Sequence, residues 1–405
     1  MTAIIHLGDC REIIATLDDN SIDAIVTDPP YELGFMGKKW DNTGIAYDIQ
    51  LWTQCLRVLK PGAHLLAFGG TRTYHRMACA IEDAGFEIRD SIHWLYGSGF
   101  PKSMDVSKAI DKAAGVKRTQ VIGWTNKGMP PGANKEVGHG EGSEPTPITA
   151  PATDVAREWE GWGTALKPAH EPIVMARKPL VGTVAATVLE HGTGALNIDG
   201  ARVPGAIKGD PNRFAKTDGG SFNAFTTPPV VRSAGRWPAN VITDGSIDAE
   251  WVRYFYCAKP SKAERNAGLD ALPVRNKSEN RNYANASRGR CQPCERWADV
   301  GEGDNCFQCG TAFERQSNAQ RPMPNNHPTV KPLDLMRYLV RLVTPPGGTV
   351  LEPFAGSGTT LAAAIIEGFN AIGCELTADY LPIIEGRIAW AQQQTEPDQE
   401  SLFNQ

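Results

Sequence analysis

The sequence predicts an α/β fold with a mostly parallel sheet that is interrupted by one long irregular region. Short β-rich apolar runs alternate with helical periodicity over residues 1–96, and the same alternation returns after residue 326. Between these blocks the periodicity dissolves into stretches rich in Gly, Pro, Asn and Ser. Because crossover-connected strands usually belong to one sheet, we expect the two blocks to form a single doubly wound domain.

The first block supplies most of the expected elements. Strands are expected where β-branched and other apolar residues run together, and helices where apolar residues recur three or four positions apart. A glycine at position 85 marks the end of the third helix. The expected strands span 3–7, 22–27, 64–68 and 87–96, and the expected helices span 9–17, 51–59 and 72–84.

The second block is shorter and begins with a strongly amphipathic helix. Its expected helices span 333–343, 359–368 and 380–393, and its expected strands span 349–352 and 371–375. The polar tail, 394–405, is expected to fray. We therefore predict one domain made of residues 1–96 and 327–393, with residues 97–326 inserted between its halves.

Charge is distributed unevenly along the chain. The net charge is -5, yet residues 97–330 carry 29 Lys and Arg against 24 Asp and Glu, whereas the two flanks carry 12 against 22. The densest basic stretch, 259–290, has eight basic and three acidic residues. Since a polyanion binds to a local basic surface, we expect it to contact the middle of the chain; a solvated basic loop is the alternative.

Composition and hydropathy bound the class of protein. An apolar fraction of 41% over 405 residues is enough for a buried core. The sequence opens without a charged-then-apolar leader and lacks an apolar run of about 18 residues, which predicts a cytoplasmic protein without a membrane segment.

The first motif that carries chemistry is the segment 22–31, which reads IDAIVTDPPY. Pro29 and Pro30 lack N–H donors and hold the turn open, so the Pro29 carbonyl and the Asp28 carboxylate can converge at the carboxyl edge of the sheet. Two such acceptors favour a pyramidal amino nitrogen whose lone pair faces an electrophile. Tyr31 would stack on an extruded base. The alternative is a structural Pro-Pro turn in which Asp28 is a cap.

The second motif is the segment 350–360, VLEPFAGSGTT, which predicts a strand, a tight glycine turn and a helix. Gly356 and Gly358 allow close approach of a ligand to the backbone, and the amides that open the helix favour its negative end. The next strand ends in Glu375, nineteen residues after Gly356, a spacing at which an acid reaches ribose hydroxyls. These features predict a nucleoside cofactor, with plain packing as the alternative.

Four of the nine cysteines are clustered in the middle region. Cys291-x-x-Cys294 is followed after eleven residues by Cys306-x-x-Cys309, a spacing that suits tetrahedral zinc held by four thiolates. We predict a zinc-ribbon-like module over 288–312, in which structural zinc folds a surface beside the basic stretch. Four reduced cysteines in a loop are the alternative.

Together the two chemical motifs resemble those of the amino-group DNA methyltransferases, which act on N6 of adenine or N4 of cytosine. In that family Asp-Pro-Pro-Tyr is catalytic and Phe-x-Gly-x-Gly binds S-adenosylmethionine. Here the catalytic motif comes first and the segment 326–332, NHPTVKP, directly precedes the glycine motif. This order is similar to the permuted β class. Residues 94–103 and 162–179 look like passages of phage-type and orphan members.

The resemblance implies a Rossmann-like, circularly permuted fold of S-adenosylmethionine-dependent methyltransferases. It makes 1–96 the catalytic half, 327–393 the cofactor-binding half, and 97–326 a target-recognition insertion that binds DNA. Glu352 stands where many members have Asp, which is one methylene shorter. The implied catalytic residues are Asp28, Pro29, Pro30 and Tyr31, and the implied cofactor contacts are Asp9, Thr329, Lys331, Glu352, Phe354, Gly356, Ser357, Gly358 and Glu375. His327 is expected to make a local hydrogen bond.

The implied reaction is direct transfer of a methyl group to N6 of adenine in a base flipped from double-stranded DNA. N4 of cytosine is the runner-up, because the same residues serve both; Asp before Pro-Pro and Tyr after it lean toward adenine. A catalytically inert, zinc-containing DNA-binding protein is a second alternative, against which the intact Asp28 and Tyr31 argue. The recognition sequence cannot be read from loops. A homodimer and a cognate restriction endonuclease stay open as partners.

Overall fold

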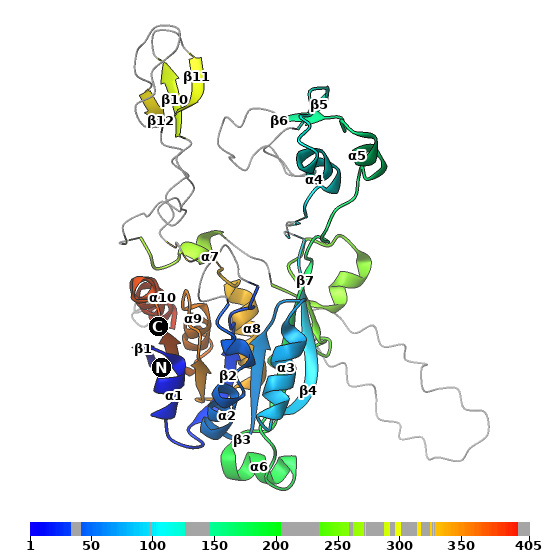
Figure 1. Cartoon of the computed structure of the whole chain (residues 1–405). Coiled ribbons are helices and arrows are strands. Elements are labelled where there is room, and N and C mark those ends of the chain that lie inside the picture. The colour runs from blue at the N-terminus through cyan, green and yellow to red at the C-terminus, as the bar shows by residue number, and fades with distance from the viewer. Residues whose placement is uncertain are drawn as a thin grey trace, which may run out of the picture. The chain divides into compact units, whose positions relative to one another are not determined.

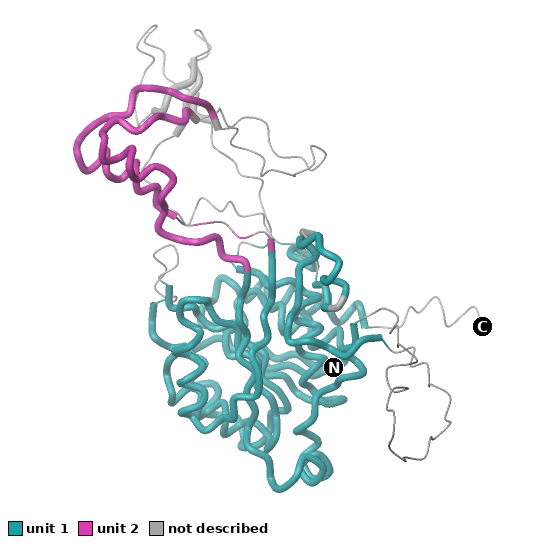
Figure 2. Tube along the Cα trace, turned by 90° about the vertical axis from the view of Figure 1, so that its right-hand side faces the viewer, with its two compact units in different colours: residues 1–96, 170–405 teal, residues 97–169 magenta. Residues whose placement is uncertain are grey.

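A computed structural model gives the structure of the chain. It describes residues 1–33, 42–97, 99, 101, 103–125, 146–203, 235–258, 262–270, 272, 287–291, 296–300, 314–316, 325, 327 and 329–395. The chain divides into two compact units, one of residues 1–96 and 170–405 and the other of residues 97–169 (Figure 2).

The larger unit is built on a nine-stranded sheet within the described residues (Figure 1). Its strand order is β1-β14-β13-β2-β3-β7-β4-β8-β9, and β7 is antiparallel to both its neighbours while the other pairs are parallel. The strands are β1 (Ala3–Leu7), β2 (Ile22–Thr27), β3 (Leu59–Phe68), β4 (Glu87–Leu95), β7 (His170–Arg177), β8 (Val241–Thr243), β9 (Tyr256–Cys257), β13 (Thr349–Glu352) and β14 (Asn370–Glu375).

Helices cover both faces of this sheet. Alternate residues of β2 belong to different apolar clusters: Ala24 and Val26 pack with α8 and α9, whereas Ile25 packs with α1, α2 and α3. Every residue of β2 is buried. The helices of this unit are α1 (Cys10–Ala15), α2 (Ile49–Val58), α3 (Tyr74–Asp83), α6 (Val184–His191), α7 (Lys262–Asn266), α8 (Leu333–Val343), α9 (Thr359–Ile366) and α10 (Leu381–Thr395), with 3-10 turns at η3 (Ile45–Tyr47), η4 (Glu250–Tyr254) and η6 (Ala378–Tyr380).

The elements expected in the two blocks are present, and β1, β2, α8 and β13 have the bounds that the sequence predicted. The middle of the chain differs from the prediction. Residues 170–203 and 235–258 belong to the larger unit, and β7 lies inside the sheet between β3 and β4. The compact unit 97–169 thus covers only the first part of the insertion predicted over 97–326. The run PIVMAR, 172–177, is buried throughout and is typical of a strand covered on both faces. It was not predicted as a strand of the sheet because loops separate it from the other periodic elements.

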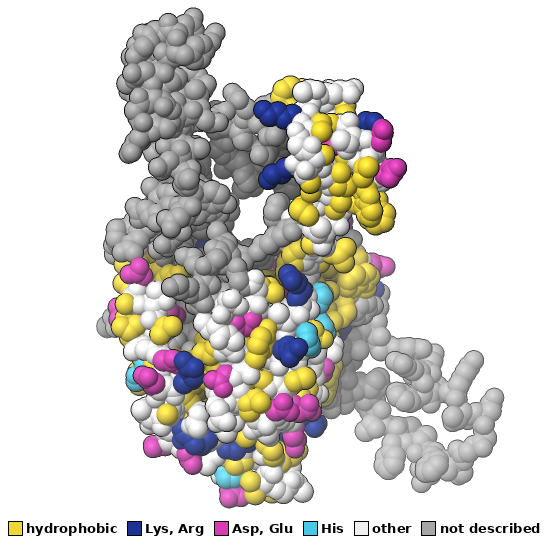
Figure 3. Space-filling model, viewed as in Figure 1, with side chains coloured by type: hydrophobic (Ala, Val, Ile, Leu, Met, Phe, Trp, Pro, Cys, Tyr) yellow, Lys and Arg dark blue, Asp and Glu magenta, His cyan; other side chains and the backbone are white. Residues whose placement is uncertain are grey.

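The smaller unit, residues 97–169, is held together by polar contacts. It contains α4 (Val106–Ala113), α5 (Asp154–Glu158) and an antiparallel pair, β5 (Val121–Thr125) and β6 (Thr146–Thr149). The buried Asp111 carboxylate accepts hydrogen bonds from Arg118 Nε at 2.6 Å and from the backbone N–H groups of Ala152 and Thr153. Exposed apolar side chains gather on this unit, among them Trp162, which is 60% exposed (Figure 3).

A separate three-stranded antiparallel sheet has the order β11-β10-β12, with strands β10 (Ser287–Cys291), β11 (Arg296–Val300) and β12 (Glu314–Gln316). Cys291 ends β10 in register with Arg296, which starts β11. Cys294, Cys306 and Cys309 lie outside the described residues, as do residues 396–405 of the tail. Among the described residues no cluster of three or more His, Cys, Asp and Glu is arranged to hold a metal, and no helix is long and apolar enough to cross a membrane.

Candidate active site

The candidate site begins at Asp28, which directly follows the buried strand β2 at the carboxyl edge of the sheet. One carboxylate oxygen, Oδ2, accepts a hydrogen bond from Lys331 Nζ at 2.7 Å. The other, Oδ1, is buried and has no hydrogen-bond partner among the described residues. A buried acceptor without a partner costs free energy, so among the described residues Oδ1 stands out as an acceptor with capacity for a further donor.

Tyr31 is fixed at both ends beside Asp28. Its carbonyl accepts a hydrogen bond from Thr73 Oγ1 at 2.8 Å, and its hydroxyl donates to Glu171 Oε2 at 2.9 Å. Lys331 Nζ donates to the same hydroxyl at 3.0 Å. Burial, with the nearby Asp28 and Glu171, holds the pKa of Tyr31 well above its ordinary value, so the phenol stays neutral.

Lys331 lies among the side chains of the catalytic motif. Its Nζ is 3.3 Å from Glu171 Oε2 as well as 2.7 Å from Asp28. It also lies 4.9 Å from the ring centroid of Phe68, at the end of β3. Burial alone would lower the pKa of Lys331, but Asp28 and Glu171 outweigh it and raise the pKa above its ordinary value. Lys331 is therefore a fixed cation, placed at Asp28 by the structure.

Glu171 was missed by the sequence analysis. It comes from β7, the strand that the sequence did not place in the sheet. Burial, with the nearby charge of Glu171, raises the pKa of Tyr96 to about 12. The available signal was an acid directly before the apolar run PIVMA, whereas Asp28 directly follows an apolar run.

The glycine motif forms the predicted strand, turn and helix. Gly356 and Gly358 both have positive φ, +55° and +72°, and Gly358 caps α9. A Cβ at Gly356 would lie 3.1 Å from His327 Nε2, and one at Gly358 would lie 3.1 Å from the Ile384 backbone of α10. The close approach at Gly358 is therefore to α10, so this glycine is needed for packing.

Glu375 ends β14 next to this loop. Its Oε2 accepts a hydrogen bond from the Gly356 N–H and its Oε1 from the Thr377 N–H, each at 2.8 Å. Burial raises the pKa of Glu375 despite these hydrogen bonds. Asp9 follows the neighbouring strand β1 and caps α1, where its partly buried carboxylate pairs with Arg11. Both acids thus stand at the carboxyl edge of adjacent strands.

Glu352, predicted as a cofactor contact, is held inside the larger unit. It is 1% exposed, its Oε1 accepts from Thr27 Oγ1 and the Phe354 N–H, and its Oε2 accepts from Thr360 Oγ1. Burial raises the pKa of Glu352 to about 8. The carboxyl group thus joins β2, the glycine loop and α9 from the inside, and it faces protein groups on both oxygens.

A second interior contact fixes the glycine loop from α10. Arg387 is fully buried and its Nη1 donates to the Ser357 carbonyl at 3.1 Å and to Thr359 Oγ1 at 2.7 Å. The Ser357 hydroxyl also meets this guanidinium, so the predicted cofactor contact of Ser357 has an interior partner. Arg387 gave no signal in the sequence, because it lies 30 positions from Ser357.

The segment before the glycine motif packs on the loop. His327 Nδ1 is hydrogen-bonded to the Thr329 carbonyl, and its ring meets Tyr380 edge-on at 4.6 Å. Burial lowers the pKa of His327 to about 4, so the neutral ring donates through Nδ1. The local hydrogen bond expected of His327 is confirmed. The Thr329 side chain is exposed, and Phe354 packs partly buried against the cluster of α1 and α2.

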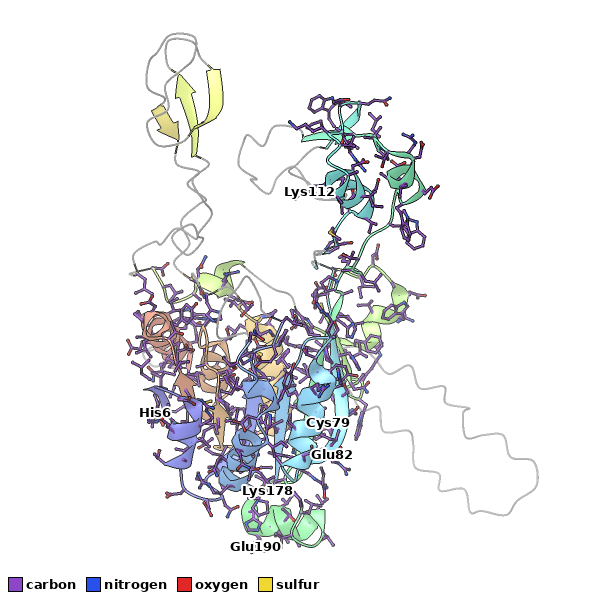
Figure 4. The ribbon with its side chains drawn as sticks, in the orientation of Figure 1. His6, Cys79, Glu82, Lys112, Lys178 and Glu190 are labelled. Carbon is purple, nitrogen blue, oxygen red and sulfur yellow. The ribbon has the colours of Figure 1, made fainter. Side chains whose placement is uncertain are left out.

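At the opposite end of the sheet the ammonium group of Lys178 has structural partners. Lys178, labelled in Figure 4, donates to the Leu59 carbonyl and to Asn20 Oδ1. His64, buried in β3, has its pKa lowered to about 4 by burial. At the carboxyl edge the unpartnered Asp28 oxygen lies where strand-end acids and a glycine loop meet, as in nucleoside-binding α/β enzymes.

Comparison with known proteins agrees with this class. A family model described as N6_N4_Mtase, DNA methylase, matches residues 22–386, so the chain belongs to this family of DNA methylases. Type II methyltransferase M.HindIII of Haemophilus influenzae is 22% identical over 93% of this chain and 91% of its own. DNA adenine methyltransferase YhdJ of Escherichia coli is 46% identical, over 14% of this chain and 19% of its own. A solved structure of PvuII DNA methyltransferase, which is cytosine-N4-specific, covers 100% of this chain and 91% of its own at 12% identity, with a TM-score of 0.45.

Proposed function

We propose that this DNA methylase transfers the methyl group of S-adenosylmethionine to N6 of adenine in a base flipped from double-stranded DNA. The observation that carries the proposal is the Asp28 carboxylate, with Oδ2 held by Lys331 and Oδ1 buried without a partner among the described residues. An exocyclic amino group is the donor that this acceptor suits. Tyr31, held at both ends, offers its ring to the face of the base.

The proposed reaction is a direct displacement. S-adenosylmethionine supplies a methyl group on a sulfonium sulfur, which is a good leaving group. Asp28 Oδ1 and the Pro29 carbonyl accept the two amino hydrogens and turn the nitrogen lone pair toward that methyl group. The N–C bond forms while the C–S bond breaks and its electron pair stays on sulfur. The surplus proton passes to Asp28, directly or through water.

The residues around the glycine loop fit a nucleoside cofactor. The Glu375 carboxylate has one protein donor on each oxygen, which leaves acceptor capacity for ribose hydroxyls. Asp9, at the adjacent strand end, is assigned to the adenine side, and the N-terminal end of α9 favours the carboxylate of the methionine portion. Glu352 and Ser357 are assigned to the interior support of the loop.

Double-stranded DNA is proposed to contact the smaller unit, 97–169, and the module over 288–312. The four thiolates of Cys291, Cys294, Cys306 and Cys309 are proposed to hold one structural zinc ion, with the first at the end of β10. We expect one zinc per chain by elemental analysis, and loss of the metal in a Cys291→Ser variant. Protein that binds no zinc after reduction and reconstitution would contradict this assignment.

The function is tested by identifying the methylated nucleoside. The purified chain is incubated with unmethylated DNA and S-adenosylmethionine labelled in its methyl group, beside an Asp28→Ala variant, and the DNA is digested and separated by chromatography. Label in N6-methyladenine that disappears in the variant supports the proposal. Label in N4-methylcytosine replaces it with the runner-up, and cofactor binding without transfer to any DNA replaces it with the inert DNA-binding protein.

A further inference from the structure

The candidate site brings one cation, Lys331, into contact with two carboxylates, those of Asp28 and Glu171. Lys331 Nζ lies 2.7 Å from Asp28 Oδ2, 3.3 Å from Glu171 Oε2 and 3.0 Å from the Tyr31 hydroxyl. The side chains of Lys331, Asp28 and Glu171 are 11%, 21% and 19% exposed. In such surroundings the charges interact more strongly than in water. The cluster as a whole carries one negative charge.

Without Glu171, Asp28 and Lys331 would form an ion pair with no net charge. A lysine ammonium with only one carboxylate partner would withdraw negative charge from the acceptor that the amino group needs. In the structure Lys331 donates hydrogen bonds to Asp28 Oδ2 and to the Tyr31 hydroxyl, and it forms a second ion pair with Glu171. Glu171 also accepts the hydrogen bond of Tyr31, so one carboxylate orients both neighbours of Asp28.

The net negative charge has a consequence for methyl transfer. The amino nitrogen is neutral before the transfer and becomes positively charged as its bond to the methyl group forms, until its surplus proton leaves. A site with one excess negative charge stabilises this developing charge, and the effect is larger where water is excluded.

We propose that Glu171 is a positioning residue of the methyl-transfer site, which holds Tyr31 and Lys331 and keeps the site negative so that Asp28 Oδ1 stays available to the amino group. The inference rests on the proposed function. A purely structural ion pair on the neighbouring strands β4 and β7 provides the contrast. There Glu87 of β4 pairs with Arg177, at the end of β7 opposite to Glu171.

This pair provides the matched control. Glu171→Gln keeps the size and a hydrogen-bond acceptor but removes the charge, Glu171→Asp keeps the charge, and Glu87→Gln removes a carboxylate of the same sheet away from the site. Steady-state transfer of labelled methyl groups gives kcat and KM, and thermal unfolding reports the fold. A further readout needs no transfer: the rate at which acetic anhydride modifies Lys331, followed by peptide mass spectrometry.

For Glu171→Gln we expect kcat to fall roughly 10- to 100-fold, with KM for the cofactor within about twofold and the melting temperature nearly unchanged. Glu171→Asp should recover part of kcat, and Glu87→Gln should keep all of it. Lys331 should be modified severalfold faster in Glu171→Gln, because its ion pair with Glu171 is lost.

Unchanged kcat or unchanged Lys331 labelling in Glu171→Gln would overturn the proposal. Equal losses of kcat in the Gln and Asp variants, accompanied by lower melting temperatures, would overturn it as well. An unmodified chain that transfers nothing would instead refute the proposed function, while the labelling of Lys331 still tests the placement by Glu171.

Discussion

The two compact units are stabilised by different means. The larger unit buries an apolar cluster on each face of its sheet, whereas the smaller unit, 97–169, is organised around the buried carboxylate of Asp111. Arg118 extends this network to Ser107, whose hydroxyl donates to the Ala156 carbonyl at 2.6 Å. An apolar core tolerates local changes, but a buried polar network depends on every partner. We therefore expect the larger unit to lose activity before it loses its fold, and the smaller unit to lose its fold first.

The largest effect is expected at Lys331. Lys331→Met leaves Asp28 and Glu171 as two carboxylates without their shared cation, and we expect kcat to fall by roughly 100- to 1,000-fold. Lys60→Met is the control, because Lys60 pairs with Asp23 near the other end of β2. Label-transfer kinetics and thermal unfolding should show lost activity with a stable fold in the first variant, and lower stability with normal kcat in the second. A stable fold with lost activity in Lys60→Met, and lower stability with normal kcat in Lys331→Met, would contradict this expectation.

Asp111 tests the smaller unit. Asp111→Ala removes the acceptor shared by Arg118, Ala152 and Thr153, so proteolytic cleavage within 97–169 should speed up by about tenfold or more while cofactor affinity stays the same. Asp154→Ala is the control, since Asp154 forms an exposed pair with Arg157. The measurement is limited proteolysis with mapping of the cleavage sites. Equal cleavage in both variants would show that the polar network does not hold this unit.

A smaller effect is expected at the glycine loop. Gly358→Ala places a Cβ 3.1 Å from the Ile384 backbone at a φ of +72°. Because such strain costs roughly 1–2 kcal/mol, we expect cofactor affinity to fall about tenfold while the sheet stays folded. Calorimetric titration with S-adenosylmethionine gives the affinity. Gly347→Ala, also at positive φ but with open space around its Cβ, separates backbone strain from the contact with α10. Equal losses at both positions would argue against a role for α10 in shaping the loop.

The smallest effect concerns Glu352 and its dependence on pH. Burial raises the pKa of Glu352 from its ordinary 4.5 to about 8, so the folded protein favours the protonated form. The stability that this group contributes is present below pH 4.5 and is lost as the pH rises through 8. Glu352→Gln lacks this loss, and its melting temperature relative to the unmodified chain should rise by a few degrees, roughly 2 to 6 °C, between pH 5 and 8.5. A difference that stays constant with pH would contradict the assignment.

The sequence predicted those parts of the molecule whose signals are local. The strand β2 was predicted to the residue because an apolar run ends sharply in Asp28 and two prolines, and the glycine turn was predicted from the two glycines between an apolar run and a helical pattern. The strand β7 was missed because the sheet places it between β3 and β4, far from its neighbours in sequence.

The contacts of the site that the sequence did not predict also join residues far apart along the chain. Lys331 reaches Asp28 across 303 positions, and Glu171 reaches Tyr31 across 140, so neither contact leaves a pattern in any short window. Glu352 was assigned to the cofactor by resemblance, yet its burial among Thr27, Thr360 and Phe354 follows from packing that one strand alone does not reveal. Residues fixed by local chemistry were thus predictable, and residues fixed by tertiary contacts were not.

The most direct test of the account is single-turnover methyl transfer by an Asp28→Ala variant whose affinities for S-adenosylmethionine and DNA are measured on the same preparation. If Asp28 Oδ1 is the acceptor for the target amino group, both affinities should stay within about threefold while the transfer rate falls by about 1,000-fold or more. A transfer rate within about tenfold of the unmodified chain, at unchanged affinities, would contradict the central role of Asp28.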